Sequence, residues 1–240
     1  MTDQIDVTID DWTAVVTVED FSPLSRHDAA LLRGLRDVVV ELSDHDEVKT
    51  VVLRARGDDF APAASPDALP PSAVLTSWHR DVAGSSALYQ ALTFAKKVVV
   101  TEVRGDCLGA GSLLVLCSDL TIAADTARFG SPFADLPESN FALAALTMRL
   151  NRAKSWMLTG SVLDAQAAYA AGLVNRVVPE ADLMTAVEGL SASTSEMPLD
   201  GVTMSKMLLQ SVLDTHGVGR DFDLADHFAV HRWSPREAQA

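Results

Sequence analysis

Residues Gly105 to Asp119 read Gly-Asp-Cys-Leu-Gly-Ala-Gly-Ser-Leu-Leu-Val-Leu-Cys-Ser-Asp. They follow the β-branched run Val98 to Val103, so the pattern predicts a buried strand, a glycine-rich turn and an apolar helix. The start of a helix presents backbone N–H groups without intrahelical partners, and the small residues Gly109, Ala110 and Gly111 let a ligand oxygen approach them. One interpretation of this turn is an oxyanion site. The other is close packing of helix against strand, and the stretch alone does not decide between them.

The composition narrows the classes of function. The chain has 240 residues, with 33 acidic against 19 basic side chains and a net charge of -14. This charge disfavours nonspecific binding to nucleic acid or to an anionic membrane surface. No apolar run approaches transmembrane length and the acidic start lacks the pattern of a secretory signal, so a cytoplasmic protein is expected. The histidines and the two cysteines, Cys107 and Cys117, have no metal-ligand or disulfide spacing, so we expect neither a metal site nor a disulfide.

Apolar periodicity predicts alternating strands and helices. Asp28 is expected to cap a helix that ends near Ser43, and Asp164 a short helix that stops at Gly172. The expected strands are Val7 to Ile9, Ala14 to Val18, Thr50 to Arg54, Val98 to Val103, Leu120 to Ala124 and Leu173 to Val178. This order predicts right-handed crossovers and a mostly parallel sheet, hence a single α/β core followed by helices.

The remaining segments are less regular. Gly57 to Ser77 contains four prolines, which predicts a surface loop that could cover a site. Ser85 or Ser86 is expected to cap the next helix, which runs to Lys97. His79 lies beside Trp78, where packing is a commoner role than catalysis. Helical patterns follow Asp182, at 183–190, 204–212 and 224–230, and their methionines are expected to fill the core.

Several segments together resemble the crotonase superfamily, the enoyl-CoA hydratase/isomerase family, over nearly the whole chain. They are Pro23-Leu24-Ser25, Gly57-Asp58-Asp59-Phe60, Gly105 to Asp119, Ala127-Arg128-Phe129-Gly130, Leu158-Thr159-Gly160 and Asp164 to Val178. The resemblance implies an α/β fold, a spiral of repeated ββα units over residues 1–181, and a C-terminal helical region, 182–240, used in trimer formation. It also implies an acyl-CoA thioester as ligand, with coenzyme A as part of the substrate and no other cofactor.

In that family two backbone N–H groups hold the thioester oxygen while the substrate becomes enolate-like. The resemblance places these donors at Ala64 and Ala110. The family usually has glycine where Ala63 and Ala110 stand, and a Cβ raises the cost of a positive φ. The substrate-binding positions implied are Leu24, Ala63, Ser65, Gly109, Leu113, Pro132 and Phe133.

The two glutamates of the family's hydratases are replaced here by Leu113 and Phe133, and neither side chain can activate water or deliver a proton. The segment between Phe129 and Gly160 also looks about four residues shorter than is usual in the family. Ordinary two-glutamate hydration is therefore not expected.

Leu136-Pro137-Glu138 resembles a segment of the family's isomerases, in which one glutamate moves a proton between carbons. Glu138 is thus the predicted base, with Asp135 as its helper. The alternatives for Glu138 are a solvated loop carboxylate or an N-terminal cap for the helical run from Ala142 to Leu150.

The resemblance favours double-bond isomerisation of an enoyl-CoA, as part of fatty acid metabolism, in a homotrimer or homohexamer. Hydration by unusual residues remains open. So does a subunit that binds acyl-CoA without chemistry, since Leu113 and Phe133 have replaced the usual acid/base groups.

Overall fold

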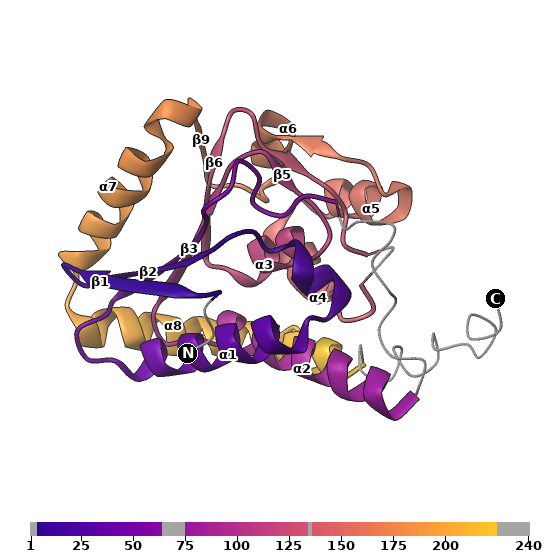
Figure 1. The fold of residues 1–240 in the computed structure, drawn as a ribbon, viewed down its shortest axis with the longest axis horizontal. Coiled ribbons are helices and arrows are strands. Elements are labelled where there is room, and N and C mark those ends of the chain that lie inside the picture. The colour runs from indigo at the N-terminus through magenta and orange to yellow at the C-terminus, as the bar shows by residue number, and fades with distance from the viewer. Residues whose placement is uncertain (1–3, 64–74, 134–135, 225–240) are drawn as a thin grey trace.

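The computed structural model describes residues 4–63, 75–133 and 136–224, and for residues 75–81 it describes the backbone alone. Its centre is a six-stranded sheet in the order β1-β2-β3-β4-β6-β9 (Figure 1). β1 pairs antiparallel with β2, and all other neighbours in this sheet are parallel. The strands are β1 (Asp6–Asp10), β2 (Thr13–Val18), β3 (Thr50–Ala55), β4 (Val98–Val103), β6 (Leu120–Ala124) and β9 (Arg176–Val178). Every predicted strand is present, although the last is shorter than predicted.

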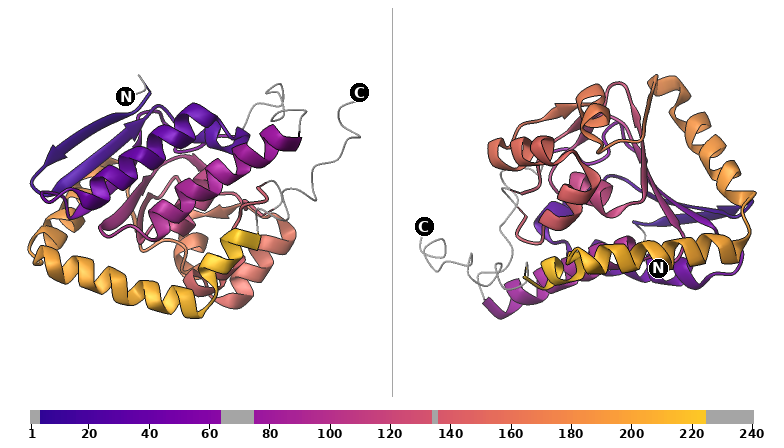
Figure 2. Two further views of the ribbon diagram at one scale, coloured as in Figure 1. Left: turned by 90° about the horizontal axis from the view of Figure 1, so that it is seen from below. Right: turned by 180° about the vertical axis from the view of Figure 1, so that it is seen from behind.

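Helices cover both faces of this sheet, which explains why its central strands are runs of apolar residues rather than alternating patterns. Val51 of β3 belongs to the core shared with α1 (Ala29–Asp44) and α2 (Leu75–Thr93). The next residue, Val52, packs on the opposite face with α7 (Leu183–Ser195), because successive strand residues point to opposite sides. Seen from below, α2 lies between α1 and α8 (Leu199–Thr215) (Figure 2).

Two of the predicted helix starts are confirmed by their hydrogen bonds. The carboxylate of Asp28 accepts from the N–H groups of Ala30 and Leu31 at 3.0 and 2.8 Å. That of Asp164 accepts from Ala167 at 2.7 Å, and Gly172 ends this helix with φ 92°. These caps satisfy N–H groups that the helix itself leaves unpaired.

A smaller sheet lies beyond the carboxyl ends of β4 and β6. It consists of β5 (Asp106–Cys107), β7 (Arg128–Phe129) and β8 (Leu163–Asp164). The helices around it are α3 (Ala110–Cys117), α4 (Phe141–Thr147), α5 (Leu150–Thr159) and α6 (Ala165–Ala171). The two short 3-10 turns are η1 (Ser22–Arg26) and η2 (Glu180–Asp182). Since parallel sheets commonly bind ligands at the carboxyl ends of their strands, this region is where a site is expected.

The structure corrects three expectations. The α2 helix begins at Leu75, so Ser85 and Ser86 are buried in its interior and neither caps it. The sequence Ala127-Arg128-Phe129-Gly130-Ser131-Pro132, after the strand at 120–124, predicts a turn, but this segment contains the short strand β7, which pairs with β5 and β8. The methionines of α8 do not fill the core, since Met204 and Met207 are 61% and 60% exposed.

The helix predicted at 224–230 falls almost entirely outside the described residues. The division into 1–181 and 182–240 remains a prediction. Packing does link its two parts, because Leu183, Ala186 and Val187 of α7 belong to the same core as Val100 of β4.

Candidate active site

The glycine-rich turn leads directly from β5 into α3, as the sequence predicts. Gly109 has φ 50°, and a Cβ at this residue would lie 2.7 Å from Oγ of Ser25. A Cβ at Gly111 would collide with the side chain of Ala61. Both positions therefore require glycine, and together they bring the N-terminus of α3 against the segments that contain Ser25 and Ala61.

Ala110, the predicted oxyanion donor, is the first residue of α3 and is fully buried. The positive φ of this turn belongs to Gly109, while neither Ala110 nor Ala63 has one. The Cβ atoms of the two alanines therefore impose no backbone strain of this kind. The N–H of Ala110 donates a 2.9 Å hydrogen bond to Oγ of Ser25. A ligand oxygen that binds this N–H would displace the Ser25 hydroxyl or share the N–H donor with it.

Ser25 and His27 belong to the same short segment at the end of η1. His27 is the residue after this turn and has left-handed backbone angles, φ 57° and ψ 43°. A non-glycine residue in this conformation costs roughly 1 to 2 kcal/mol. Because two residues of chain span at most about 7 Å, one short segment contacts both the Ala110 donor, through Ser25, and the group bound by His27.

That group is Glu138, whose side chain is completely buried. Its Oε1 lies 3.0 Å from Nε2 of His27 and accepts a 2.7 Å hydrogen bond from Oγ of Ser85. The three side chains come from the residue after η1, from α2 and from the segment before α4. The structure thus joins the predicted base to two residues that sequence reasoning did not assign to the site.

The charge of His27 decides the ionisation of this carboxyl. Burial alone would raise the pKa of Glu138, but the opposite charge of protonated His27 and the hydrogen bonds from His27 and Ser85 hold that pKa below its ordinary value. Nearby, burial and then the charge of Glu138 raise the pKa of Tyr89 well above its ordinary value. The site therefore contains an ionised carboxylate beside a neutral phenol.

Neither alternative interpretation of Glu138 agrees with the structure. The carboxylate is 0% exposed, so it is not a solvated loop residue. The cap of α4 is Asn140, whose side chain accepts a 2.8 Å hydrogen bond from the N–H of Leu143 and donates to the carbonyl of Val218 at 3.0 Å. Glu138 has neither ordinary structural role.

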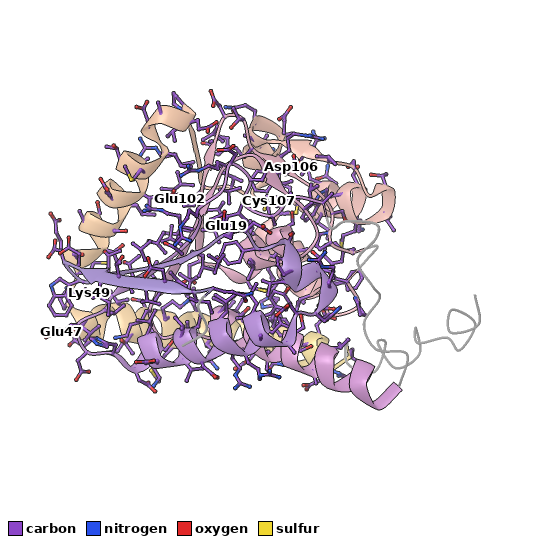
Figure 3. The ribbon with its side chains drawn as sticks, in the orientation of Figure 1. Glu19, Glu47, Lys49, Glu102, Asp106 and Cys107 are labelled. Carbon is purple, nitrogen blue, oxygen red and sulfur yellow. The ribbon has the colours of Figure 1, made fainter. Side chains whose placement is uncertain are left out.

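A second buried carboxylate, that of Glu102, has a structural role and can be compared with Glu138. Glu102, on β4, receives Nε and Nη2 of Arg54 on Oε2 at 2.9 and 2.6 Å, and Nη2 of Arg104 on Oε1 at 2.9 Å. Glu102 is labelled among the side chains of the central strands in Figure 3. With both oxygens bonded to guanidinium groups, Glu102 has no oxygen left for chemistry.

The positions of the family's hydratase glutamates are apolar here in structure as well as in sequence. Leu113, in the first turn of α3, is fully buried, as is Leu24. Phe133 is half-buried, with its ring centroid 4.7 Å from that of Phe141 and 6.1 Å from that of Trp156. Pro132, which precedes it, is buried as well. Both positions of the family's glutamates are therefore occupied by apolar side chains, one fully buried and one half-buried.

Some predicted site residues cannot be placed. Ala64, Ser65, Asp135 and the side chain of His79 lie outside the described part of the chain. Ala63 is described and is exposed, without a contact that assigns it to the site. The roles of all these residues remain predictions.

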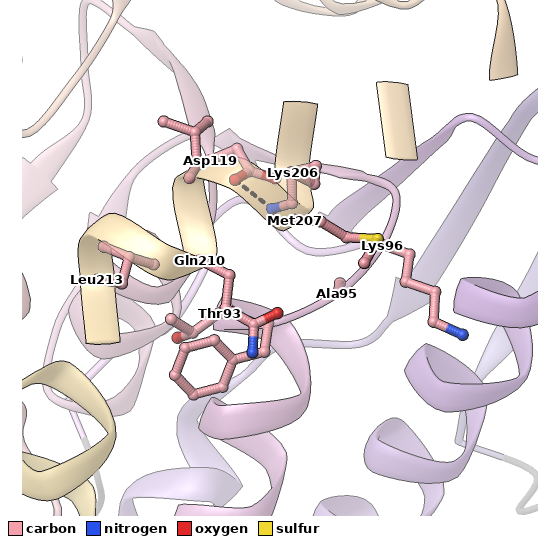
Figure 4. Close-up of a pocket in the computed structure, with 10 residues that line it drawn as sticks. Thr93, Ala95, Lys96, Asp119, Lys206, Met207, Gln210 and Leu213 are labelled. Atoms are coloured by element: carbon pink, nitrogen blue, oxygen red, sulfur yellow. Dashed lines mark hydrogen bonds and ion pairs between the residues drawn. The ribbon is translucent and has the colours of Figure 1, made fainter. Parts of the chain in front are cut away.

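Two hollows on the described surface contain none of the predicted site residues. One, of about 520 Å³, lies between β1 and α1 and is lined by Ile5, Val7, Ile9, Ala30, Arg33, Gly34, Asp37, Val38, Glu41, Leu42 and His45. The other, of about 40 Å³, lies between the end of α2 and α8, beside the ion pair of Lys206 and Asp119 (Figure 4). Neither brings together acid/base groups with oxyanion donors, so we keep the Glu138 region as the candidate site.

The signals for the missed residues were present but weak. Ser25 belongs to the Pro23-Leu24-Ser25 segment that carries the resemblance, and His27 follows it closely. A lone histidine next to a helix start has no sequence partner that would indicate an ion pair. Ser85 was assigned to a cap because the beginning of α2 lacks clear helical periodicity.

Within the described residues no three histidine, cysteine, aspartate or glutamate side chains gather to hold a metal ion. Over the same residues, no helix has both the length and the hydropathy needed to cross a membrane.

Comparison with known proteins shows the family of the chain. The family model described as enoyl-CoA hydratase/isomerase matches residues 13–223. The chain is 28% identical over 202 residues to the probable enoyl-CoA hydratase echA8 of Mycobacterium tuberculosis, covering 82% of this chain and 77% of that protein. It is 26% identical over 213 residues to the 4-chlorobenzoyl coenzyme A dehalogenase-1 of an Arthrobacter species, covering 84% and 77%.

A solved structure gives the same fold. The enoyl-CoA hydratase/isomerase of Xanthobacter autotrophicus superposes with a TM-score of 0.83 at 21% identity, over 96% of this chain and 87% of that one. The predicted crotonase-like α/β fold is thereby confirmed.

Proposed function

Because the chain belongs to the enoyl-CoA hydratase/isomerase family, we propose that it acts on an acyl-CoA thioester and moves the double bond of an enoyl-CoA. The observation that carries this proposal is Glu138, a buried carboxylate with a lowered pKa whose Oε2 has no hydrogen-bond partner among the described residues. Such an oxygen is available to take a proton from carbon and return it elsewhere.

In the proposed reaction the thioester oxygen lies at the N–H groups of Ala110 and Ala64. Charge that develops on this oxygen is stabilised by the donors and by the positive end of the α3 dipole. Asp135 assists Glu138. Leu24, Ala63, Ser65, Gly109, Leu113, Pro132 and Phe133 surround the substrate, and the coenzyme A moiety is the only carrier group required.

Isomerisation is preferred because it needs one proton carrier, whereas hydration in this family uses two glutamates. Leu113 and Phe133 stand in their places, and neither side chain can activate water or deliver a proton. Glu138 has no exposed surface, so the substrate proton reaches Oε2 only when the surrounding side chains move apart.

Two other functions compete with this proposal. Hydration would require His27 or another group to replace a missing glutamate. A subunit that binds acyl-CoA without turnover is favoured by Leu113, by Phe133 and by the bond between Ser25 and the Ala110 donor.

The decisive experiment offers 3-enoyl-CoA and 2-enoyl-CoA to the wild type and to Glu138→Gln, following the conjugated thioester by absorbance and the products by mass. We expect conversion of 3-enoyl-CoA without gain of water, and loss of this conversion in the variant. Gain of water by 2-enoyl-CoA would replace isomerisation by hydration, and equal isomerase rates would remove Glu138 from the mechanism. Calorimetric binding of acyl-CoA without any turnover would favour the inactive subunit, and no binding would exclude all three functions.

We also propose that the protein assembles as a homotrimer or a pair of trimers. The support is the apolar surface of α8, where Met204, Met207 and Leu208 are 61%, 60% and 70% exposed. A contiguous apolar surface of this kind is uncommon on a monomer. Light scattering at micromolar concentrations tests it, and a monomer at every concentration would refute it.

A further inference from the structure

The two oxygens of the Glu138 carboxylate have different surroundings. Oε1 receives both Nε2 of His27 and Oγ of Ser85, at 3.0 and 2.7 Å. Oε2 is buried and has no hydrogen-bond partner in the part of the chain that the structure describes. Leaving a buried polar oxygen unbonded costs on the order of 1 to 3 kcal/mol. The contrast with Glu102, whose two oxygens are both bonded, indicates that Oε2 is kept open for a reason other than stability.

His27 is held firmly in the position from which it contacts Oε1. Its N–H donates to the carbonyl of Leu24 at 3.0 Å, its backbone is left-handed, and its side chain is 3% exposed. A strained backbone of this kind persists only where the surroundings fix it, and such residues cluster at functional sites. The same segment holds Ser25 against the Ala110 N–H, so one turn contacts both the carboxylate and the oxyanion donor.

We propose that His27 is a positioning residue, which keeps Glu138 ionised through Oε1 and leaves Oε2 as the oxygen that exchanges a proton with the substrate. Ser85, on α2, donates a hydrogen bond to the same oxygen. This inference rests on the proposed isomerisation, since it assigns the proton of that reaction to one oxygen atom.

The proton balance is complete without any further reactant. The C2–H bond of a 3-enoyl thioester breaks, its proton forms an O–H bond at Oε2, and the electron pair moves into a dienolate whose oxygen lies at the Ala110 N–H. The O–H bond then breaks, a C4–H bond forms, and the electron pair returns to give the 2-enoyl thioester. His27 keeps its proton throughout. While Glu138 holds the substrate proton, the positive charge of His27 and the negative charge of the dienolate are present in the site together and attract each other.

The other described ionisable groups near the pair do not interfere with its titration. Tyr89, from α2, stays neutral because burial and the charge of Glu138 raise its pKa. Burial raises the pKa of Cys117, from α3, to about 12. Asp28, which follows His27, uses its carboxylate to cap α1, and Arg26 precedes His27 on η1. The active form of the pair has an ionised Glu138 and a protonated His27. This form is lost at low pH, when Glu138 gains a proton, and at high pH, when His27 loses one.

The first test needs no substrate. The carboxyl carbons of glutamate are labelled with ¹³C, the signal of Glu138 is assigned by its absence in Glu138→Gln, and its titration is followed in the wild type and in His27→Gln. Glutamine can still donate a hydrogen bond to Oε1 but carries no charge. We expect the Glu138 midpoint to lie below that of ordinary glutamates in the wild type and to move to higher pH in the variant, because burial then acts without an opposing cation.

His216→Gln is the matched control. His216 is exposed at the end of α8, where its Nδ1 contacts the carbonyl of Val212, and its replacement leaves the Glu138 midpoint unchanged. Equal midpoints in the wild type and His27→Gln would overturn the proposal. If His27→Gln does not fold, the titration of the wild type tests the proposal by itself. A Glu138 midpoint at or above that of ordinary glutamates would then overturn the proposal.

The second test uses the reaction. In His27→Gln we expect kcat for 3-enoyl-CoA at neutral pH to fall roughly 10²-fold while KM changes little, as for a misplaced catalytic group. The acidic limb of the kcat profile moves to higher pH and the alkaline limb disappears. A merely structural His27 would lower stability and leave both limbs in place, which would refute the positioning role.

The two tests separate failure of this inference from failure of the proposed function. A shifted Glu138 midpoint without turnover of any enoyl-CoA would support the ion pair and overturn the reaction. Turnover that depends on Glu138, with a midpoint that His27→Gln leaves in place, would support the reaction and overturn the role of His27.

Discussion

The hydroxyl of Ser25 accepts a hydrogen bond from the backbone N–H of Ala110 at 2.9 Å, across 85 residues of sequence. This bond satisfies the first N–H of α3, which would otherwise be an unpaired donor at a helix start. In the proposed reaction the thioester oxygen requires the same donor. Ser25 therefore stabilises the ligand-free protein and competes with the substrate for one N–H group.

Ser25→Ala is expected to tighten the binding of acyl-CoA. A net hydrogen bond is worth about 1 kcal/mol, so without the competing hydroxyl the dissociation constant falls roughly five-fold. The same change lowers the free energy of unfolding by about 1 kcal/mol, because the Ala110 N–H loses its partner. Calorimetry and denaturant unfolding measure the two effects. Ser193→Ala, on the exposed side of α7, is the control, and weaker acyl-CoA binding in Ser25→Ala would contradict competition.

The stability difference between the wild type and Glu138→Gln is expected to depend on pH. A carboxyl whose pKa is lowered on folding stabilises the protein above its unfolded pKa, and this contribution disappears as the pH falls through the folded pKa. Removing one partner of a buried ion pair costs about 3 to 5 kcal/mol at neutral pH, and the difference should shrink below about pH 4.

Urea unfolding at a series of pH values measures this difference. Glu47→Gln, at an exposed position, serves as the control for loss of one carboxylate and should change the free energy of unfolding only slightly. A difference for Glu138→Gln that grows as the pH falls would contradict the lowered pKa of Glu138.

The two cysteines are expected to resist thiol reagents in the folded protein. Cys107 and Cys117 are buried, and burial raises the pKa of both thiols, that of Cys117 to about 12. The reactive thiolate is therefore scarce at pH 8 and inaccessible. A chromogenic disulfide reagent should detect thiols only after denaturant is added, when both of the chain's cysteines react. Rapid reaction of either thiol in the native protein would contradict the burial of that thiol.

Gly109→Ala should lower the stability of the fold, whereas Gly84→Ala should not. At Gly109 a methyl group would meet Oγ of Ser25 at 2.7 Å, on a backbone with φ 50°. The conformational penalty alone is roughly 1 to 2 kcal/mol, and the α3 N-terminus would move away from the site. At Gly84, inside α2, a Cβ meets no heavy atom within 4 Å, so alanine should stabilise by up to about 1 kcal/mol. Thermal unfolding of the two variants checks this, and equal effects would argue against the geometry of the turn.

Leu208→Glu tests the proposed assembly. Leu208 is 70% exposed on α8, so the change should leave the fold intact while placing a charge in the expected contact between copies. Light scattering should then show dissociation at micromolar concentration. Val40→Glu, at a 49% exposed position on α1, should keep the wild-type mass, and an unchanged mass in Leu208→Glu would exclude this face of α8 from the contact.

The secondary structure was largely predictable because its signals are local. Runs of β-branched residues predicted the strands, and the caps Asp28 and Asp164 predicted two helix starts that the hydrogen bonds confirm. These features depend on residues within one turn or one strand of each other. The start of α2 at Leu75 was missed because the four prolines of the preceding stretch and a weak apolar pattern favoured a longer loop.

The predicted site residues were also found from sequence, whereas the exposed face of α8 was not. Glu138 as a base, and Leu113 and Phe133 as replacements, followed from sequence position within a recognisable family pattern. The exposure of the α8 methionines did not, because helical periodicity alone does not state which helix face meets the core and which remains open.

The sequence by itself determined the order of strands and helices, the glycine-rich start of α3 and the family to which the chain belongs. Only the tertiary structure decided that His27 and Ser85 both bind one oxygen of Glu138 and that Ser25 occupies the Ala110 donor. The physical reason is that local patterns arise from backbone geometry and burial over a few residues. A buried ion pair instead depends on how distant segments pack, and its partners have no regular spacing in the chain.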